Sequence, residues 1–313
     1  MELKRFLPYS SAKDRWEESQ PKPSAHCSPV RPSLILSLPH GKTLTLGPAA
    51  ALMGIVNVTP DSFSDGGAFA SVAAAVAHGE RLASEGAAIL DVGGESTRPK
   101  ASPVAADEEM ARAIPVIAEL SRRAALPISI DTMKARVAAA AIEAGASIVN
   151  DVWGFQKDPE IARVAADTGA AAVLMHNRDS LDASLDIVAD VIAFLSRSID
   201  LALAAGIARE KLILDPGFGF GKTPAQNFEL IRRLGEFSVL GCPILIGVSR
   251  KSSIGGVTGQ KNAAERLAGS LAAGLAGVAN GAAILRVHDV APHWQALQVL
   301  QAIGGPPQSR EAE

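Results

Sequence analysis

The stretch that decides the fold is L-I-L-D-P-G-F-G-F-G-K, which runs from Leu212 to Lys222. Three apolar residues lead directly into Asp215, and a proline, three glycines and two phenylalanines follow before the lysine. A short apolar run that ends in a carboxylate and a glycine-rich loop is typical of a buried parallel strand with functional groups at its carboxyl end. Glycine permits positive φ angles and lets a flat ligand approach the backbone closely. Asp-Pro-Gly is also ordinary turn chemistry, so this stretch alone leaves a purely structural turn open.

The same pattern of apolar run, loop and Ala-rich segment repeats from residue 51 onward. The apolar runs cover residues 51–56, 88–90, 128–130, 147–149, 171–174, 212–214, 244–246 and 282–285. The segments expected to be helical cover residues 71–85, 107–124, 134–144, 159–167, 185–205, 224–234, 263–279 and 291–301. Eight alternating units in about 250 residues predict an α/β fold, the closed (β/α)8 or TIM barrel. An open doubly wound sheet is the alternative, although no G-x-G-x-x-G motif follows the first run.

Residues 33–46 precede the barrel pattern and predict a short N-terminal β-hairpin, because alternating leucines flank the turn sequence His40-Gly41-Lys42. We expect this hairpin to cover one end of the barrel. Residues 1–31 are polar and contain several prolines, so we expect a poorly ordered extension there. A single barrel domain is then expected over residues 32–303, followed by a tail over residues 304–313.

Composition and charge exclude several classes of protein. The chain has 313 residues, of which 48% are hydrophobic and 20% charged, enough apolar material for a large core. Its net charge of −3 offers no basic surface for nucleic acid and no polybasic membrane signal. Residues 1–31 lack the apolar segment of a secretory signal, and the apolar run at residues 271–285 is too short to span a bilayer. Cys27 and Cys242 match no metal or disulfide motif, so a reduced cytoplasmic setting is expected.

Polar or ionisable residues follow every expected strand, at the end of a barrel where active sites are built. One set follows the third, fourth, sixth and seventh runs and comprises Asp131, Asn150, Asp215 and Lys251. Carboxylates and amides pair with the planar edge of a heterocycle, and a lysine can serve a ring oxygen or nitrogen. Met175 and Phe220 could line the faces of a flat ring. This set suits an aminopyrimidinone such as a pterin or a guanine.

A second set comes from the ends of the first, second and eighth strands and comprises Asn57, Thr97, Arg98, Arg286 and His288. Arginine pairs bidentately with phosphate oxygens, and an asparagine oxygen is a ligand for Mg²⁺. The two sets together predict a site for a heterocycle joined to a diphosphate.

Five motifs containing these residues resemble those of the dihydropteroate synthases, a family of pterin-binding enzymes. They are M-G-I-V-N-V-T-P-D-S-F-S-D-G-G at 53–67, I-L-D-V-G-G-E-S-T-R-P at 89–99, L-D-P-G-F-G-F-G-K at 214–222, S-R-K-S at 249–252 and R-V-H-D at 286–289. The resemblance implies a (β/α)8 barrel and a transferase of an alkyl or aryl group other than methyl. The implied reaction joins 6-hydroxymethyl-7,8-dihydropterin diphosphate to p-aminobenzoate, giving 7,8-dihydropteroate and diphosphate in folate biosynthesis.

The resemblance also assigns roles to positions. It places the pterin at Asp131, Asn150, Asp215 and Lys251, and the expected catalytic residues are Asp131, Asp215, Lys251 and Arg286. It places Mg²⁺ at Asn57, with Asp65 as a second candidate ligand, and the diphosphate at Arg286 and His288. It places p-aminobenzoate at Phe63, Arg98, Pro99 and Ser252. It further implies a homodimer built on the late helices, where Gly269, Gly274 and Gly277 would allow close packing.

Some neighbouring residues have simpler interpretations. Lys222 could be a surface lysine at a helix start, and His176 could be a buried histidine bonded to a neighbour. Asp91 and Glu95 could orient the loop that follows them. Lys100 and the pair Asn177-Arg178 depart from the family's usual residues, but neither replaces a residue assigned to chemistry.

Two other functions remain open on the sequence. A methyltransferase on the same pterin-binding barrel should lack the S-R-K-S motif and a diphosphate site, and this chain has both. A non-catalytic pterin-binding paralogue should have lost part of the set Asn57, Arg98, Lys251 and Arg286, and all four are present.

Overall fold

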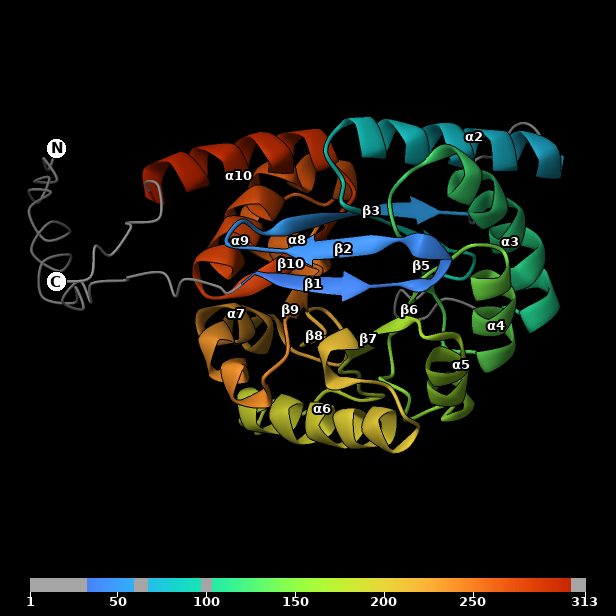
Figure 1. Cartoon of the computed structure of the whole chain (residues 1–313). Coiled ribbons are helices and arrows are strands. Elements are labelled where there is room, and N and C mark those ends of the chain that lie inside the picture. The colour runs from blue at the N-terminus through green and yellow to red at the C-terminus, as the bar shows by residue number, and fades with distance from the viewer. Residues whose placement is uncertain (1–32, 59–66, 97–102, 305–313) are drawn as a thin grey trace, which may run out of the picture.

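The computed structural model describes residues 33–58, 67–96 and 103–304. The expected N-terminal extension, and all of the expected tail except Gly304, lie outside the described residues. The described chain forms a closed barrel of parallel strands surrounded by helices, and a two-stranded sheet crosses one end of it (Figure 1).

Eight parallel strands close the barrel in the order β10-β3-β4-β5-β6-β7-β8-β9. They are β3 (Ala51–Asn57), β4 (Ile89–Gly93), β5 (Ile128–Asp131), β6 (Ile148–Asp151), β7 (Ala171–Met175), β8 (Leu212–Asp215), β9 (Ile244–Ile246) and β10 (Ala282–Val287). Strand β10 pairs with both β9 and β3, so the alternative of an open doubly wound sheet is wrong. Each predicted apolar run overlaps one strand, and most strands continue into the polar residue that follows the run.

Helices connect successive strands and cover the outside of the barrel (Figure 1). They are α2 (Gly67–Ser84), α3 (Ala106–Arg123), α4 (Ala135–Glu143), α5 (Glu160–Thr168), α6 (Ile187–Ala204), α7 (Pro224–Arg232), α8 (Ser252–Thr258), α9 (Leu267–Ala279) and α10 (Val290–Gly304). Short 3-10 helices are η1 (Pro39–Gly41), η3 (Arg209–Lys211), η4 (Leu234–Leu240) and η5 (Ala263–Arg266). In the part of the chain that the structure describes, no helix is long and apolar enough to cross a membrane.

The sequence predicts eight of these helices with shifted ends and does not predict α8. Gly255 and Gly256 make α8 a poor helix by propensity alone. Tertiary packing favours it, because a Cβ on Gly269 of α9 would lie only 2.4 Å from a methyl carbon of Ile254. The close approach of α8 to α9 therefore holds the segment that begins with two predicted site residues, Lys251 and Ser252.

The predicted hairpin is confirmed as β1 (Leu34–Ser37) paired antiparallel with β2 (Thr43–Leu46). One face of it is buried through Leu36, Leu38, Leu44 and Leu46. These leucines pack against the first residues of barrel strands, including Ile89, Ile148 and Ala171. The hairpin thus closes the amino end of the barrel and leaves the carboxyl ends of the strands at the opposite end.

Two basic side chains of the hairpin turn fasten it to helix C-termini. Lys42 Nζ donates to the carbonyl oxygen of Ala124, after α3, at 3.0 Å. His40 Nε2 lies 2.9 Å from the carbonyl oxygen of Ile142 in α4. Carbonyl groups at helix C-termini lack helical partners and carry partial negative charge, so basic donors stabilise them.

We expect Leu36→Ala to lower the free energy of unfolding by about 2–5 kcal/mol, because it opens a cavity between the hairpin and the barrel. The control is Ile35→Ala on the same strand, since Ile35 is 64% exposed and Leu36 only 2%. We expect that control to change the unfolding free energy by less than about 1 kcal/mol. Urea denaturation measures both values. Equal losses would contradict the role of the hairpin as the closed end of the core.

Candidate active site

Predicted site residues lie at the carboxyl ends of the barrel strands, opposite the hairpin. Three of them, Asn57, Asp131 and Asp215, are each the last residue of a strand. Asn150 and Arg286 are each the next-to-last residue of their strands. Asp131 is 4% exposed and Asp215 is 5% exposed. Because buried charged groups need partners, their local contacts decide what this end of the barrel can bind.

Arg286 of β10 reaches two neighbouring strands, β4 and β5, through charge-assisted hydrogen bonds. Its Nε donates to Asp91 Oδ2 and its Nη2 donates to Asp131 Oδ2, both at 2.6 Å. The Asn150 amide donates to the Asp91 carboxylate at 3.2 Å. Arg286, Asp91, Asp131 and Asn150 therefore form one buried polar cluster. The diphosphate role assigned to Arg286 must be compatible with these two carboxylate bonds.

Asp131 is poised between its two protonation states. Burial raises the pKa of Asp131 to about 7, with a further rise from the charge of Asp91, while Arg286 lowers it. Its Oδ1 atom is buried and has no hydrogen-bond partner among the residues that the structure describes. A buried oxygen without a donor is costly, so this atom is suited to accept a hydrogen bond from a ligand N–H.

Asp215 is a second buried carboxylate. Burial raises its pKa, whereas the Gly217 N–H and the charges of Lys251 and Arg286 lower it. The Gly217 N–H donates to Asp215 Oδ1 at 2.7 Å and fixes the orientation of the carboxylate.

The glycine-rich loop after β8 has the backbone that its glycines predict. Gly217, Gly219 and Gly221 have φ angles of +71°, +86° and +57°. A Cβ on Gly217 would lie 1.9 Å from the His176 carbonyl oxygen, so no other residue fits there. The loop presents the Phe220 ring, whose centroid lies 4.0 Å from Lys251 Nζ. This cation–π contact brings together two residues predicted to bind the pterin.

The backbone before Lys251 is strained and firmly held. Arg250 has a φ angle of +60°. Its N–H donates to Ser270 Oγ and its carbonyl accepts from Arg266, both at 2.9 Å. Its guanidinium also donates to Asp289 at 3.0 Å. These contacts fix the turn that directs Lys251 toward the glycine-rich loop.

The other described residues that the sequence predicts to bind substrate lie around the same rim. Met175 is the buried last residue of β7 and pairs in register with Asp215. His288 Nδ1 lies 3.1 Å from Ser249 Oγ, which links the loops after β10 and β9. Ser252 is the exposed first residue of α8.

Five predicted site residues lie outside the described residues, namely Phe63, Asp65, Thr97, Arg98 and Pro99. Lys100, noted for its departure from the family pattern, also lies outside them. Glu95 precedes the undescribed segment 97–102, and its contacts support the expected role of orienting the following loop. Glu95 Oε1 accepts from the Val104 N–H at 3.1 Å, and its other oxygen pairs with Lys134. Glu95 therefore joins the two ends of the segment that contains Arg98.

The sequence analysis did not predict the burial of two charged side chains, those of Lys222 and Asp91. The interpretation of Lys222 as a surface lysine is wrong, because it is 5% exposed and donates to the carbonyl oxygens of Gly217 and Phe220. Lys222 lies just before the N-terminus of α7, where the helix dipole disfavours a positive charge. A lysine at such a position needs acceptors that compensate, and this was the available signal in the sequence. Asp91 lies within an apolar run, which marks an inward-facing carboxylate. The alternative for His176 is confirmed, since it is buried and bonded to Lys222.

Known proteins share this sequence pattern and fold. A family model described as pterin binding enzyme matches residues 53–288. The dihydropteroate synthase of Clostridium beijerinckii is 44% identical over 263 residues, covering 84% of this chain and 97% of that protein. The dihydropteroate synthase of Bacillus subtilis is 47% identical over 239 residues, covering 76% of this chain and 83% of that protein.

Solved structures agree. The Xanthomonas albilineans dihydropteroate synthase with 4-aminobenzoic acid matches with a TM-score of 0.84 and 48% identity, covering 88% of this chain and 100% of that chain. The dihydropteroate synthase from the same organism in complex with 7,8-dihydropteroate matches with a TM-score of 0.80 and 46% identity, covering 87% of this chain and 100% of that one.

A closed (β/α)8 barrel with buried carboxylates, an amide and a lysine–phenylalanine pair at its carboxyl end defines a heterocycle-binding barrel enzyme. With the family match over most of its length, the chain belongs to the pterin-binding enzymes and, among these, to the dihydropteroate synthases, which are transferases. This favours the synthase over the methyltransferase alternative.

Arg286→Met should lower the free energy of unfolding by about 3–5 kcal/mol at pH 8, because it leaves buried carboxylates without their cation. The pKa of Asp131 is about 7 even with Arg286 present, so protonation at pH 5 should relieve part of this loss. Guanidinium chloride denaturation at the two pH values measures the difference.

The control for this prediction is Arg233→Met. Arg233 also pairs with carboxylates, those of Asp186, Glu229 and Glu236, but all three are at least 36% exposed. We expect a much smaller loss for this variant than for Arg286→Met, because solvent screens exposed ion pairs. An Arg286→Met loss that is equal at both pH values would show that the carboxylates are not its cause.

Proposed function

We propose that the chain condenses 6-hydroxymethyl-7,8-dihydropterin diphosphate with p-aminobenzoate, giving 7,8-dihydropteroate and diphosphate. The observation that carries this proposal is the buried Asp131 oxygen, which lacks a donor among the described residues and lies at the same end of the barrel as the paired Lys251 and Phe220. The relatives named with 4-aminobenzoic acid and 7,8-dihydropteroate support the choice of substrate and product.

In this proposal the pterin edge is read by hydrogen bonds. Asp131, Asn150 and Asp215 accept from or donate to the aminopyrimidinone, and Lys251 donates to a ring oxygen or nitrogen. Phe220 and Met175 contact the faces of the ring. A ligand N–H at Asp131 Oδ1 would lower the raised pKa of this carboxyl and favour its charged form.

The chemical step needs no activated nucleophile. The bond between the pterin methylene carbon and the diphosphate oxygen breaks, and its electron pair leaves with the diphosphate. Asp131 and Asp215 offset the positive charge that then spreads over the pterin. The amine lone pair of p-aminobenzoate forms the new C–N bond, and the nitrogen loses a proton to solvent. Arg286 and His288 are assigned to the diphosphate, with Thr97 in the same anion-binding set, and Phe63, Arg98, Pro99 and Ser252 are assigned to p-aminobenzoate.

We expect Asp131→Ala and Lys251→Ala each to lower kcat/KM by about 10²–10³, since each removes a charged group from the reacting pterin. Diphosphate release in the presence of both substrates is the measurement, and it should require both of them. The control is Lys157→Ala, because Lys157 Nζ also lies over an aromatic ring, 4.4 Å from the Trp153 centroid, but is not assigned to substrate.

Near-normal turnover in both site variants would contradict the assignment. Pterin binding by the unaltered chain without diphosphate release would instead favour the non-catalytic paralogue.

We also propose that Mg²⁺ binds at Asn57, with Asp65 as a second candidate ligand. Asn57 is half-buried at the end of β3 and offers an amide oxygen, a hard ligand that suits this ion. Mg²⁺ commonly takes only one or two protein ligands and completes its shell with substrate phosphate and water, so this donor set fits. When bound, Mg²⁺ would supply positive charge to the leaving diphosphate.

Removal of divalent ions by EDTA should abolish turnover, and added Mg²⁺ should restore it. We expect Asn57→Ala to raise the Mg²⁺ concentration for half-maximal turnover by about tenfold, which corresponds to one lost ligand worth about 1.4 kcal/mol. Asn57→Asp keeps an oxygen ligand and is the matched control. Full turnover of the metal-free protein would contradict the proposal.

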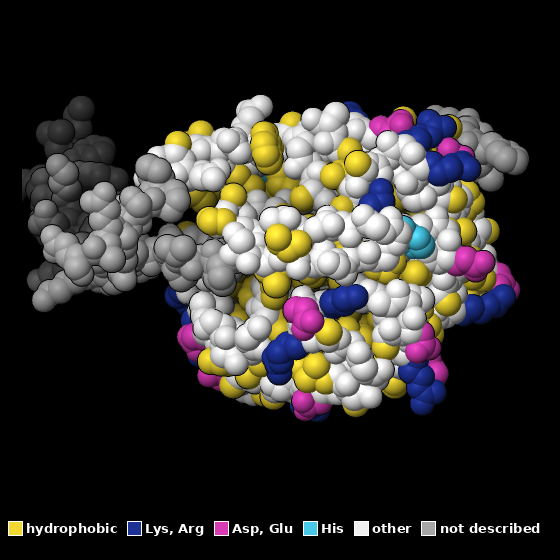
Figure 2. All heavy atoms as spheres, in the orientation of Figure 1, with side chains coloured by type: hydrophobic (Ala, Val, Ile, Leu, Met, Phe, Trp, Pro, Cys, Tyr) yellow, Lys and Arg dark blue, Asp and Glu magenta, His cyan; other side chains and the backbone are white. Residues whose placement is uncertain are grey.

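A homodimer through the outer face of α9 is a further part of the proposal. Helix α9 carries no charged residue, and its outward positions include Ala268, Ala272 and Ala276. The neighbouring α10 exposes Trp294 and Val299, and Figure 2 shows apolar atoms over α10. Burial of this surface against a second copy would remove apolar area from water.

The glycines of α9 do not support this interface, contrary to the sequence argument. Gly269, Gly274 and Gly277 lie against side chains of the same subunit, including Leu285 and Ile246. Light scattering should give twice the 32.3 kDa of one chain. Ala272→Glu, on the outward face, should give the mass of a single chain, and a single-chain mass for the unaltered protein would contradict the dimer.

The proposed location is the cytoplasm. Burial raises the pKa of the Cys242 thiol, which disfavours its reactive thiolate form. A chain whose cysteines fit no disulfide framework suits a reducing compartment.

A further inference from the structure

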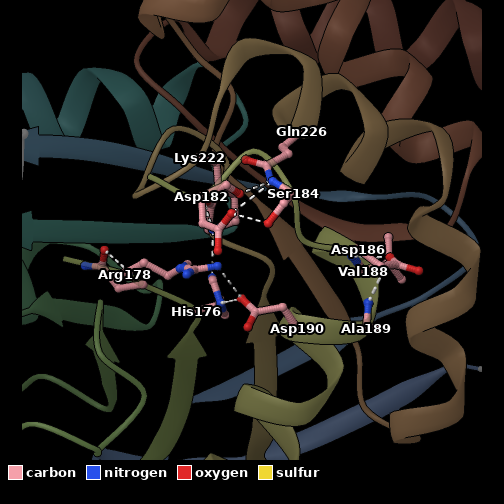
Figure 3. A network of polar contacts seen from close by, with 12 residues as sticks. His176, Arg178, Asp182, Ser184, Asp186, Val188, Ala189, Asp190, Lys222 and Gln226 are labelled. Atoms are coloured by element: carbon pink, nitrogen blue, oxygen red, sulfur yellow. Dashed lines mark hydrogen bonds and ion pairs between the residues drawn. The ribbon is translucent and has the colours of Figure 1, made fainter. Parts of the chain in front are cut away.

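Lys222 ends the loop that presents Phe220, and its ammonium group has three acceptors, one of which is the His176 ring (Figure 3). Nζ donates to His176 Nδ1 at 2.7 Å, to the Gly217 carbonyl at 2.8 Å and to the Phe220 carbonyl at 3.0 Å. An ammonium group has three N–H bonds and no acceptor, so three acceptors match it. Burial lowers the pKa of Lys222 to about 7, and the charges of Asp215 and Asp190 oppose this.

His176 connects Lys222 to a carboxylate on α6. Because Nδ1 accepts from Lys222, the proton of the neutral ring lies on Nε2, which is 3.0 Å from Asp190 Oδ2. Burial and the charge of Lys222 lower the pKa of His176 to about 2, so the ring stays neutral. Asp190 also accepts from Arg178 at 3.2 Å. Arg178, a departure from the family pattern, thus takes part in the same network.

The loops after β7 and β8 are packed tightly against each other around this network. A Cβ on Gly221 would lie 2.5 Å from the Cβ and carbonyl oxygen of Arg178. The Gln226 amide, at the start of α7, donates to the Asp182 carbonyl at 2.7 Å (Figure 3). Lys222 therefore acts inside a rigid junction, where a change at its ammonium group is transmitted to the backbone of the loop.

That backbone carries two groups of the proposed pterin site. The peptide group of Gly217 accepts from Lys222 through its carbonyl, and the Gly217 N–H donates to Asp215 Oδ1. The Phe220 carbonyl accepts from Lys222, and the Phe220 ring meets Lys251. Between these two carbonyls, the Gly219 N–H donates to Asn227 Oδ1 at 2.7 Å. One buried ammonium group thus holds both ends of the loop segment 217–220.

We propose that Lys222, oriented by His176, is a positioning residue for the pterin end of the site. It sets the carboxylate of Asp215 and the ring of Phe220 through the loop backbone and does not contact the substrate. This inference rests on the proposed function, because it concerns the same pterin site.

The test is Lys222→Met, which keeps the length of the side chain and removes its three N–H bonds. We expect the Kd for 6-hydroxymethylpterin to rise by about tenfold, because the loop carbonyls lose their shared donor and the loop relaxes. The KM for dihydropterin diphosphate should rise by a similar factor, and the KM for p-aminobenzoate should change by less than about twofold. This division between the two substrates is a result that a general loss of stability does not produce.

The matched control is Lys211→Met. Lys211 Nζ also donates to a loop carbonyl, that of Gly169 at 2.6 Å, but Lys211 precedes β8 at the amino end of the barrel. We expect this control to lower the thermal midpoint while leaving the Kd for 6-hydroxymethylpterin unchanged. A folded Lys222→Met protein that binds 6-hydroxymethylpterin with the unaltered Kd overturns the inference.

If Lys222→Met does not fold, His176→Leu and His176→Asn form a second pair. His176→Leu removes the acceptor for Lys222, whereas His176→Asn keeps an amide oxygen near the position of Nδ1. A larger Kd for His176→Leu than for His176→Asn supports the inference, and equal values overturn it. Failure of the unaltered chain to bind any pterin or to release diphosphate would overturn the proposed function itself. That outcome differs from a failure of the Lys222 inference, in which the unaltered chain binds pterin and the variants bind it equally well.

Discussion

The chemistry at the carboxyl end of the barrel depends on how Arg286 is balanced against two buried carboxylates. Its bonds to Asp91 and Asp131 keep charge inside an otherwise apolar barrel. The balance is incomplete, because burial still raises the pKa of Asp131 to about 7. An incompletely satisfied carboxyl group is a disadvantage for stability and an advantage for binding, since a ligand donor can satisfy it.

The hairpin compensates for this polar end of the barrel, because it supplies apolar burial at the opposite end. Its leucines fill the amino end of the barrel, where small residues such as Ala171 and Ala283 leave room inside the strands. The carboxyl end can then hold polar groups without being the main source of apolar burial.

Local sequence predicted the barrel well because each strand is a continuous apolar run bounded by a polar residue and an Ala-rich helix. It also predicted most of the rim, because parallel strands place their last residues at one end. It did not predict the partners of those residues. Arg286 is 195 positions from Asp91 and 155 from Asp131, and no local pattern reports such contacts. Lys222 and α8 were missed for the same reason, since tertiary packing decides both. The roles of the site residues stay predictions, and Phe63 and Arg98 also lie outside the described part of the chain.

The charges of the described site nearly cancel before any substrate binds. Three cations, Lys222, Lys251 and Arg286, lie close enough to Asp215 to lower its pKa, and Arg286 also pairs with Asp91 and Asp131. Three cationic side chains thus face three carboxyl groups, and burial favours the neutral forms of both Lys222 and Asp131. A diphosphate brings further negative charge to this end of the barrel, and it needs positive charge that these groups do not have to spare. This demand for positive charge is a physical reason for the proposal that Mg²⁺ at Asn57 joins Arg286 and His288 in holding the diphosphate.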